Sequence, residues 1–330
     1  MHRSLSSSPR WPVVTDEESP AWGVDSAQLV DVTGLQLGDV SPEWAFGGAT
    51  GEGVRVAIVD SGIEADHPAL EGCVDVDASV TVSLDTSGQP IVEAGLHGDA
   101  FGHGTACAGI IHGIAPKARI TSVAVLGPRL SGKAAVFHAG LAWAVNGGYD
   151  VVNLSLGTTK RDWALPFYEL CDWGYFRNST IVTAANNRPR ASFPSLYASV
   201  LSVAATDATD PRALYWNPTP PTEFLAPGIG IDVAWRGGSR LVGTGNSYAA
   251  PHVAGLAALV RSKHPRLRPA HVKAVLSAVA LNVSDTAAVR VPGRFNRVVR
   301  DEPAPHRVRA QAVAISVGDV VDIRGSNEHG

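Results

Sequence analysis

The regular alternation of short β-branched runs with helix-like stretches is the feature that most limits how this chain can fold. The run Val54 to Val59 stops at the turn-forming residues Asp60-Ser61-Gly62. A helix-like stretch, Lys133 to Asn146, lies among further strand-like runs at residues 120–126, 151–156, 180–184 and 200–204. This alternation predicts an α/β fold with a central, mainly parallel sheet and helices on both faces. Ligands bind such sheets beyond the carboxyl ends of the strands, so we expect the chemistry there.

The composition of the chain limits which classes of binding partner we expect. The chain has 330 residues, of which 45% are hydrophobic and 18% charged, which is enough for one domain with a large core. Its net charge of -4, from 27 basic and 31 acidic residues, gives no reason to expect nucleic acid or an anionic membrane as a partner. The longest apolar run, residues 249–260, is interrupted by Pro251 and is far shorter than the roughly 20 residues of a membrane span.

The N-terminus and the cysteines indicate the compartment. The first 14 residues carry Ser, Pro and Arg where a secretory signal needs an apolar stretch of about 7 or more residues. The 3 cysteines are too few for a disulfide framework, and none forms a CxxC metal pair. We therefore expect a cytoplasmic protein without a cofactor. Arginine far outnumbers lysine, a bias common in GC-rich bacterial genomes, so we expect a bacterial source.

Four short segments carry residues suited to acyl transfer by a serine. They are Asp60-Ser61-Gly62, Gly102-His103-Gly104-Thr105, Ala184-Ala185-Asn186-Asn187 and Gly245-Asn246-Ser247-Tyr248. Taken singly, each has an ordinary explanation as a turn, a loop or a helix cap. Together they supply a hydroxyl, an imidazole, a carboxylate to orient it, and donors for an oxyanion.

These segments resemble the signature blocks of the subtilisin-like serine proteases, the subtilases, and follow that family's order over about residues 42–285. The resemblance implies a subtilisin-like three-layer α/β fold and a serine endopeptidase. It makes Ser247 the nucleophile, His103 the general base and then acid, and Asp60 the group that orients the imidazole. The side-chain amide of Asn187 and the backbone N–H of Ser247 would form the oxyanion hole.

The resemblance also implies where a peptide substrate lies. An extended peptide would bind between two strand edges, with its side chains entering pockets alternately. One edge comprises Leu126, Gly127, Ser131 and Gly132, the other comprises Ser155, Leu156 and Gly157, and Ala184, Ala185, Asn186 and Arg188 border the primary specificity pocket. Arg188 at the rim favours an acidic residue on the acyl side of the scissile bond, whereas a pocket governed by shape alone would favour large apolar residues.

Two positions depart from the family's pattern. Asn186 stands where the family usually has Gly, a change that can alter the turn, although Asn tolerates left-handed backbone geometry better than most residues. Asn246 stands where the family usually has Thr, so the hydroxyl that commonly supports the oxyanion is absent. The short spacing from His103 to Pro116 leaves no room for the calcium loop of many secreted relatives, so we expect no metal site.

The resemblance divides the chain into three parts: an N-terminal extension (1–40), a catalytic domain (41–285) and a C-terminal extension (286–330). Residues 1–40 are interpreted either as an inhibitory arm or as a disordered extension. In the catalytic domain, residues 249–260 predict a buried helix and residues 268–281 an amphipathic helix with Pro269 at its start. Residues 312–323 predict one or two edge strands.

Three functions are compatible with these residues. The leading one is an endopeptidase that trims a bacterial precursor peptide. A peptide ligase or macrocyclase would use the same acyl-enzyme but must exclude water, and no large insertion near the site supplies a cover. A catalytically silent peptide-binding scaffold is disfavoured because Asp60, His103, Asn187 and Ser247 are all present.

Overall fold

The computed structural model describes residues 40–95, 98–219, 221–283, 316–318 and 320–322. The predicted N-terminal extension, apart from Val40, and most of the C-terminal extension therefore lie outside the described residues. Within the latter, β12 (Ser316–Gly318) and β13 (Val320–Asp322) form a separate antiparallel pair rather than an edge of the main sheet.

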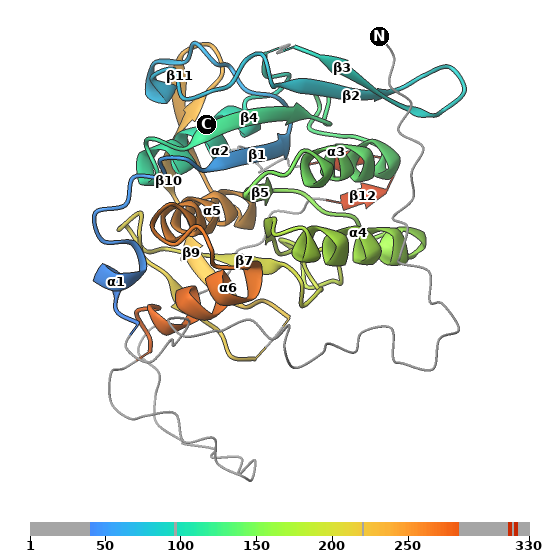
Figure 1. Cartoon of the computed structure of the whole chain (residues 1–330). Coiled ribbons are helices and arrows are strands. Elements are labelled where there is room, and N and C mark those ends of the chain that lie inside the picture. Colours follow the sequence, from blue (N-terminus) through green and yellow to red (C-terminus); the bar gives the residue numbers. More distant parts are fainter. Residues whose placement is uncertain (1–39, 96–97, 220, 284–315, 319, 323–330) are drawn as a thin grey trace, which may run out of the picture.

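A nine-stranded sheet with the strand order β3-β2-β4-β1-β5-β6-β7-β9-β8 forms the centre of the molecule (Figure 1). Every neighbouring pair from β2 to β9 is parallel, and only the edge strands β3 and β8 are antiparallel. The strands are β1 (Arg55–Asp60), β2 (Val80–Leu84), β3 (Pro90–Ala94), β4 (Arg119–Ala124), β5 (Val151–Leu154), β6 (Thr180–Ala184), β7 (Leu201–Thr206), β8 (Tyr215–Trp216) and β9 (Phe224–Pro227). The predicted parallel sheet is confirmed.

Helices cover both faces of the sheet. On one face α2 (His103–Ile114) and α5 (Asn246–Lys263) lie against the strands, with α1 (Pro42–Phe46) and α6 (Pro269–Ala278) packed on α5. On the other face lie α3 (Ala134–Asn146) and α4 (Ala164–Phe176) (Figure 1). Two short 3₁₀ helices, η2 (Pro68–Leu70) and η3 (Arg161–Trp163), complete the helical elements of the described chain.

The alternation of side chains along β1 divides the core into two. Successive residues of a strand point to opposite faces of its sheet. Val56 and Ile58 accordingly join the cluster that contains α2 and α5, whereas Ala57 and Val59 join the cluster that contains α3 and α4. This arrangement is the expected three-layer α/β architecture.

The helix α5 runs through the interior of the molecule. All but a few of its 18 residues are buried, and many of them are alanine or glycine, which lets neighbouring elements approach closely. The predicted buried helix thus extends beyond residues 249–260 at both ends, and the predicted amphipathic helix is α6. A hairpin of β10 (Ile231–Trp235) and β11 (Ser239–Gly243) packs on α2. No helix of the described chain is long and apolar enough to cross a bilayer.

Candidate active site

The site residues gather at the carboxyl edge of the sheet because the strands that carry them are parallel neighbours. In the order β4-β1-β5-β6, Asp60 is the last residue of β1 and Ala184 the last residue of β6. Leu126 lies just beyond β4, and its N–H and that of Val125 donate to the carbonyl of Asp60 at 3.2 and 2.8 Å. Ser155 follows β5 directly. The fold therefore brings together residues that are far apart in sequence.

Asp60 and His103 form a buried pair. Nδ1 of His103 lies 2.9 Å from each oxygen of the Asp60 carboxylate, and the side chains of His103 and Asp60 are 0% and 1% exposed. A carboxylate accepts hydrogen bonds, so Nδ1 carries the proton and Nε2 of the neutral ring presents its lone pair. Burial alone would lower the pKa of His103, but the negative charge of Asp60 outweighs it and holds the pKa well above its ordinary value.

Asp99, which the sequence analysis missed, fixes the start of the helix that carries His103. Its Oδ1 accepts hydrogen bonds from Ser61 Oγ at 2.8 Å and from two loop amides, and its Oδ2 accepts from the N–H and Oγ1 of Thr105. Ser61 Oγ in turn accepts from Gly104 N at 3.1 Å. Asp99 thus ties the residue after Asp60 to the first turn of α2. The signal in the sequence was an aspartate four residues before the histidine, whose short carboxylate can accept hydrogen bonds from the backbone amides that follow it.

Ser247 lies in the first turn of α5, close to the imidazole, since Cys107 Sγ is 3.8 Å from both the Ser247 carbonyl oxygen and His103 Nδ1. Ser247 as a residue is 1% exposed, and the ring of the next residue, Tyr248, packs with its centroid 5.1 Å from that of His103. Within the described chain neither Ser247 Oγ nor His103 Nε2 makes a hydrogen bond. Catalytic hydrogen bonds are often long in free enzymes and tighten with substrate, so both groups remain available for reaction.

The carbonyl of Ser247 is held from outside its own helix. In a regular α-helix it would accept from the N–H four residues later, but that residue is Pro251, which has no N–H. Ser155 Oγ donates to this carbonyl at 2.8 Å and itself accepts from Asn153 Nδ2 at 3.0 Å. Ser155 was predicted to bind substrate, and the structure shows that its side chain supports the segment that carries Ser247.

Two asparagines, Asn187 and Asn246, join the loop after β6 to the start of α5. Asn187 Oδ1 accepts from Asn246 N at 2.9 Å, which leaves the amide Nδ2 of Asn187 as a donor. A Cβ placed on Gly245 would lie 3.7 Å from this Nδ2 and 3.3 Å from Ser247 Oγ, so the two groups border the same space. The N–H of Ser247 is in the first turn of α5 and has no intrahelical acceptor.

The side chain of Asn246 bonds to the backbone of β7 and of the loop after β6, so it does not replace the threonine hydroxyl that the sequence lacks. Its Oδ1 accepts from Ala205 N at 2.9 Å, and its Nδ2 donates to the carbonyls of Ala185 and Asn186 at 3.2 Å each. The side chain thereby holds the loop from β6 against β7. Asn186 does not have a left-handed backbone, and its Oδ1 accepts from Arg188 N at 2.8 Å, which closes a local turn.

The predicted substrate-binding residues line the same edge. Gly127 N donates to Ser131 O at 2.9 Å and Leu130 N donates to Gly127 O at 2.8 Å, so residues 127–131 form a closed loop after β4. On the other side Thr158 exchanges two backbone hydrogen bonds with Phe193, so residues 155–157 run between β5 and this bridge. Leu126 and Leu156 are buried, whereas Arg188 is exposed. Their contacts with a peptide stay predictions.

Cys107 lies beneath the pair. Its Sγ is 3.8 Å from His103 Nδ1 and 3.4 Å from Ser155 Oγ. Asp60, His103 and Cys107 form the one group in the described chain whose atoms are spaced like metal ligands. Burial raises the pKa of the Cys107 thiol, however, and a metal ligand must be a thiolate. The chemistry of this group favours the hydrogen-bonded pair over a metal site.

A buried carboxylate and imidazole beside a serine at a helix N-terminus are the arrangement that defines serine hydrolases with an Asp, His and Ser triad. The sequence model of the subtilase family matches residues 51–299, which is most of the chain. The chain therefore belongs to the subtilase family, and it is a subtilisin-like serine endopeptidase.

Relatives and solved structures agree with this assignment. M-protease of Shouchella clausii (strain KSM-K16) is 32% identical over 285 residues, which cover 83% of this chain and 68% of the relative. Subtilisin DY of Bacillus licheniformis is 31% identical over 254 residues, which cover 72% of this chain and 88% of the relative. A cold-adapted subtilisin-like serine proteinase superposes with a TM-score of 0.58 at 25% identity, covering 72% of this chain and 86% of that structure.

Proposed function

We propose that Ser247, His103 and Asp60 act as the catalytic triad of this endopeptidase. Ser247 Oγ attacks the carbonyl carbon of the scissile peptide bond while its proton passes to His103 Nε2. The imidazolium then gives this proton to the nitrogen of the leaving amine, and the C–N bond breaks to leave an ester on Ser247. A water molecule then attacks the ester carbonyl while its proton passes to His103 Nε2. His103 returns this proton to Ser247 Oγ, and the acyl product leaves as a carboxylic acid. The observation that supports these roles best is the contact of Nδ1 with both oxygens of Asp60, because it leaves Nε2 as the base.

The oxyanion that develops on the carbonyl oxygen would be met by two donors. These are Asn187 Nδ2, which is oriented because Asn187 Oδ1 accepts from the backbone N–H of Asn246, and the N–H of Ser247 at the positive end of the α5 dipole. Loss of one such donor typically lowers the rate about 10²- to 10³-fold. Asn187→Ala should therefore reduce kcat much more than it changes KM.

The triad is tested by replacing Ser247 with alanine. We expect Ser247→Ala to lose peptide hydrolysis and labelling by a fluorophosphonate probe while keeping its melting temperature, since only one oxygen atom is removed. Ser262→Ala, which removes one hydroxyl farther along α5, serves as the matched control, and it should still be labelled. Near wild-type turnover by Ser247→Ala would refute the assignment.

For the substrate, we propose an extended peptide with an acidic residue on the acyl side of the cleaved bond. Arg188 is exposed, and its backbone is fixed by the turn with Asn186. At a solvent-exposed position, a guanidinium typically raises the preference for a substrate carboxylate by about 2- to 5-fold. The test compares kcat/KM for peptides that carry Glu, Gln, Leu or Phe at this position, with wild type and with Arg188→Glu. Preference for Leu and Phe in both enzymes would show that pocket shape governs the choice.

We further propose that the biological role is the trimming of a precursor peptide. A narrow sequence preference would support this role, whereas cleavage of many unrelated sequences would contradict it. Cleavage of a peptide library, read by mass spectrometry, measures this breadth directly. The same spectra separate hydrolysis from ligation, because a ligase would yield cyclic or joined products that lack the added mass of water.

A further inference from the structure

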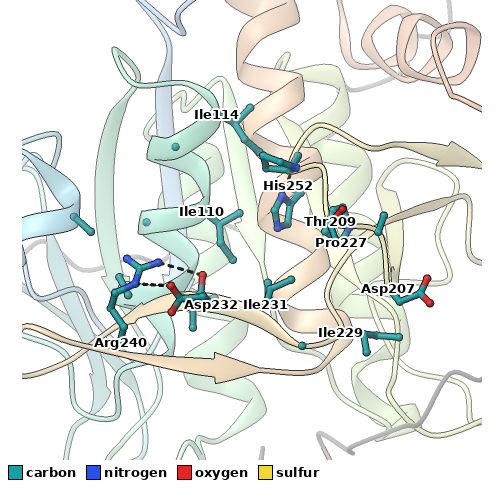
Figure 2. A pocket seen from close by; sticks show the side chains of 18 residues that line it. Ile110, Ile114, Asp207, Thr209, Pro227, Ile229, Ile231, Asp232, Arg240 and His252 are labelled. Carbon is teal, nitrogen blue, oxygen red and sulfur yellow. Dashed lines mark hydrogen bonds and ion pairs between the residues drawn. The ribbon is translucent and has the colours of Figure 1, made fainter.

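A pocket of about 420 Å³ lies beside the C-terminal half of α2 and His252 of α5 (Figure 2). Its walls are α2, α5, the β10–β11 hairpin and the loop after β7. The hairpin is held in place because the carboxylate of Glu64 accepts from the amides of Gly237 and Gly238 at its turn. The pocket is of the size that small-molecule sites have.

His252 gives the pocket a buried, unpartnered polar atom. Its side chain extends from α5 toward the pocket (Figure 2), and the residue is 5% exposed. Nδ1 lies 2.8 Å from the carbonyl oxygen of Pro211. Because a carbonyl only accepts, Nδ1 carries the proton and Nε2 of the neutral ring is an acceptor. Nε2 makes no hydrogen bond within the described chain.

The neutral state of His252 follows from its surroundings. Burial lowers its pKa to about 4, so the ring is uncharged at pH 7 and keeps the acceptor at Nε2. A buried acceptor without a partner is unfavourable, and most such groups in proteins are paired with protein, water or ligand. A donor that reached Nε2 would satisfy it.

The rest of the lining indicates what accompanies that donor. Much of the wall is aliphatic, with Ile110, Ile114, Ile229, Ile231 and Val233 among its members. Arg240 is paired with Asp232: its Nε donates to the Asp232 carboxylate at 2.8 Å, and its Nη2 donates to the Asp232 backbone carbonyl at 3.3 Å. Asp207 adds an exposed negative charge at the pocket. This combination suits an apolar molecule with an N–H or O–H group and disfavours an anion.

We propose that this pocket binds a small, uncharged aromatic molecule that carries one hydrogen-bond donor, with the donor on His252 Nε2 and the ring among the isoleucines. The site is separate from the catalytic one. His252 lies about one and a half helical turns beyond Ser247, so it projects to a different side of α5. Binding therefore needs no free catalytic serine.

The test compares indole with benzofuran, which has nearly the same shape but no N–H group. Binding is measured on the full-length chain with ¹⁵N-labelled histidine, so that the Nε2 resonance of His252 reports the contact directly. We expect indole to bind with a Kd on the order of 1 mM or below and about 3- to 10-fold more tightly than benzofuran. Indole should also shift the His252 Nε2 resonance strongly through the hydrogen bond, whereas benzofuran bound in the same place should shift it much less.

Two variants locate the effect. His252→Asn keeps a donor toward Pro211, and its shorter side chain leaves no acceptor at the position of Nε2, so the preference for indole over benzofuran should fall to about 1-fold. Ile231→Trp fills the pocket and should weaken both compounds while His252 is retained. Equal affinity of the two compounds for wild type, a preference that persists in His252→Asn, or no binding of either compound would overturn the proposal. If His252→Asn fails to fold, the comparison of indole with benzofuran on the wild type and the result for Ile231→Trp still test the proposal.

Discussion

The two nitrogens of the His103 ring have different surroundings, and this difference sets the pH range of the enzyme. Nδ1 faces the Asp60 carboxylate, whose negative charge stabilises the protonated ring against the effect of burial. A general base acts only when it is neutral, so the rate falls as the pH drops through the pKa of His103. Since that pKa is raised, the acid limb of kcat/KM should lie above the ordinary histidine value of about 6.5.

Asp60→Asn tests this electrostatic coupling. Removing the negative charge lowers the pKa of His103, so the acid limb of kcat/KM should move to lower pH. The rate itself should drop about 10⁴-fold, because an amide no longer holds the ring in the productive tautomer. The measurement is a pH profile of kcat/KM for both enzymes. An acid limb that stays in place would show that Asp60 does not control the protonation of His103.

Cys107 provides a second probe at the residue scale. Its thiol is fully buried and its pKa is raised, so iodoacetamide, which needs the thiolate, should react slowly with the folded enzyme. A mercurial that does bind Sγ must displace the imidazole, because Nδ1 is only 3.8 Å away, and hydrolysis should stop. Activity is followed against bound mercury. The Cys107→Ala variant, which keeps Cys73 and Cys171, should stay active in the presence of the mercurial. If the mercurial inhibited this variant as strongly as the wild type, the inhibition would come from a residue other than Cys107.

At the scale of elements, the sequence predicts the central parallel strands well because each is a short β-branched run buried on both faces. The helix α4 was missed, since Pro166 and several aromatic residues in it favour helix weakly and it is defined by its packing against α3. The hairpin of β2 and β3 was missed for a related reason: β3 is an edge strand with no fully buried residue. Tertiary contacts outweigh local preference in both.

In the candidate site, too, some residues could be predicted from the sequence and others could not. Motif residues such as Asp60, His103 and Ser247 are visible because they stand in short, ordered segments. The supporting roles of Asp99, Ser155 and Asn246 depend on hydrogen bonds to residues 38, 92 and 41 positions away. Nothing in the local sequence encodes such a partner. These bonds become apparent only when the strands are placed side by side.

The junction of β5 and α5 yields a prediction at this scale. Ser155 Oγ donates to the carbonyl of Ser247 in place of the N–H that Pro251 lacks. Ser155→Ala therefore removes this hydrogen bond from the Ser247 carbonyl. We expect Ser155→Ala to lower the free energy of unfolding by about 1–3 kcal/mol and to reduce kcat, because the segment of the nucleophile loses its support. In a Pro251→Ala background the restored helical N–H should reduce this cost by about 1 kcal/mol.

Ser262→Ala is the matched control for this cycle. Ser262 lies on the same helix, and its Oγ donates to Glu52 O at 2.9 Å in a more exposed place. The cost of Ser262→Ala should be the same in the Pro251→Ala background as in the wild-type background. Urea unfolding of the single and double variants gives the coupling free energy. Additive costs for Ser155→Ala and Pro251→Ala would contradict the proposed replacement of one donor by another.

At the scale of the whole molecule, Arg261 connects the far end of α5 to the opposite edge of the sheet. Its guanidinium is 5% exposed and lies 2.9 Å from Asp150 Oδ1, next to the start of β5. It also donates to Asn178 Oδ1, at 2.9 Å, and to the carbonyl of Leu267 before α6. Asp150 Oδ2 accepts from Arg55 N at the start of β1. One side chain therefore fixes several elements at the edge opposite the active site.

Replacing Arg261 should consequently destabilise the whole fold and leave the chemistry intact. Arg261→Met leaves Asp150 partly buried without its counter-charge, which costs about 2–4 kcal/mol once the partial exposure of Asp150 is allowed for. The exposed pair of Lys117 and Glu52 is the control, and Lys117→Met should cost less than about 1 kcal/mol. Both are measured by urea unfolding in a Ser247→Ala background, which prevents self-digestion. In the active enzyme at about 25 °C, kcat/KM of Arg261→Met should match wild type, because no contact of Arg261 reaches the triad. A cost no greater than that of Lys117→Met would show that the buried pair does not hold this edge of the molecule together.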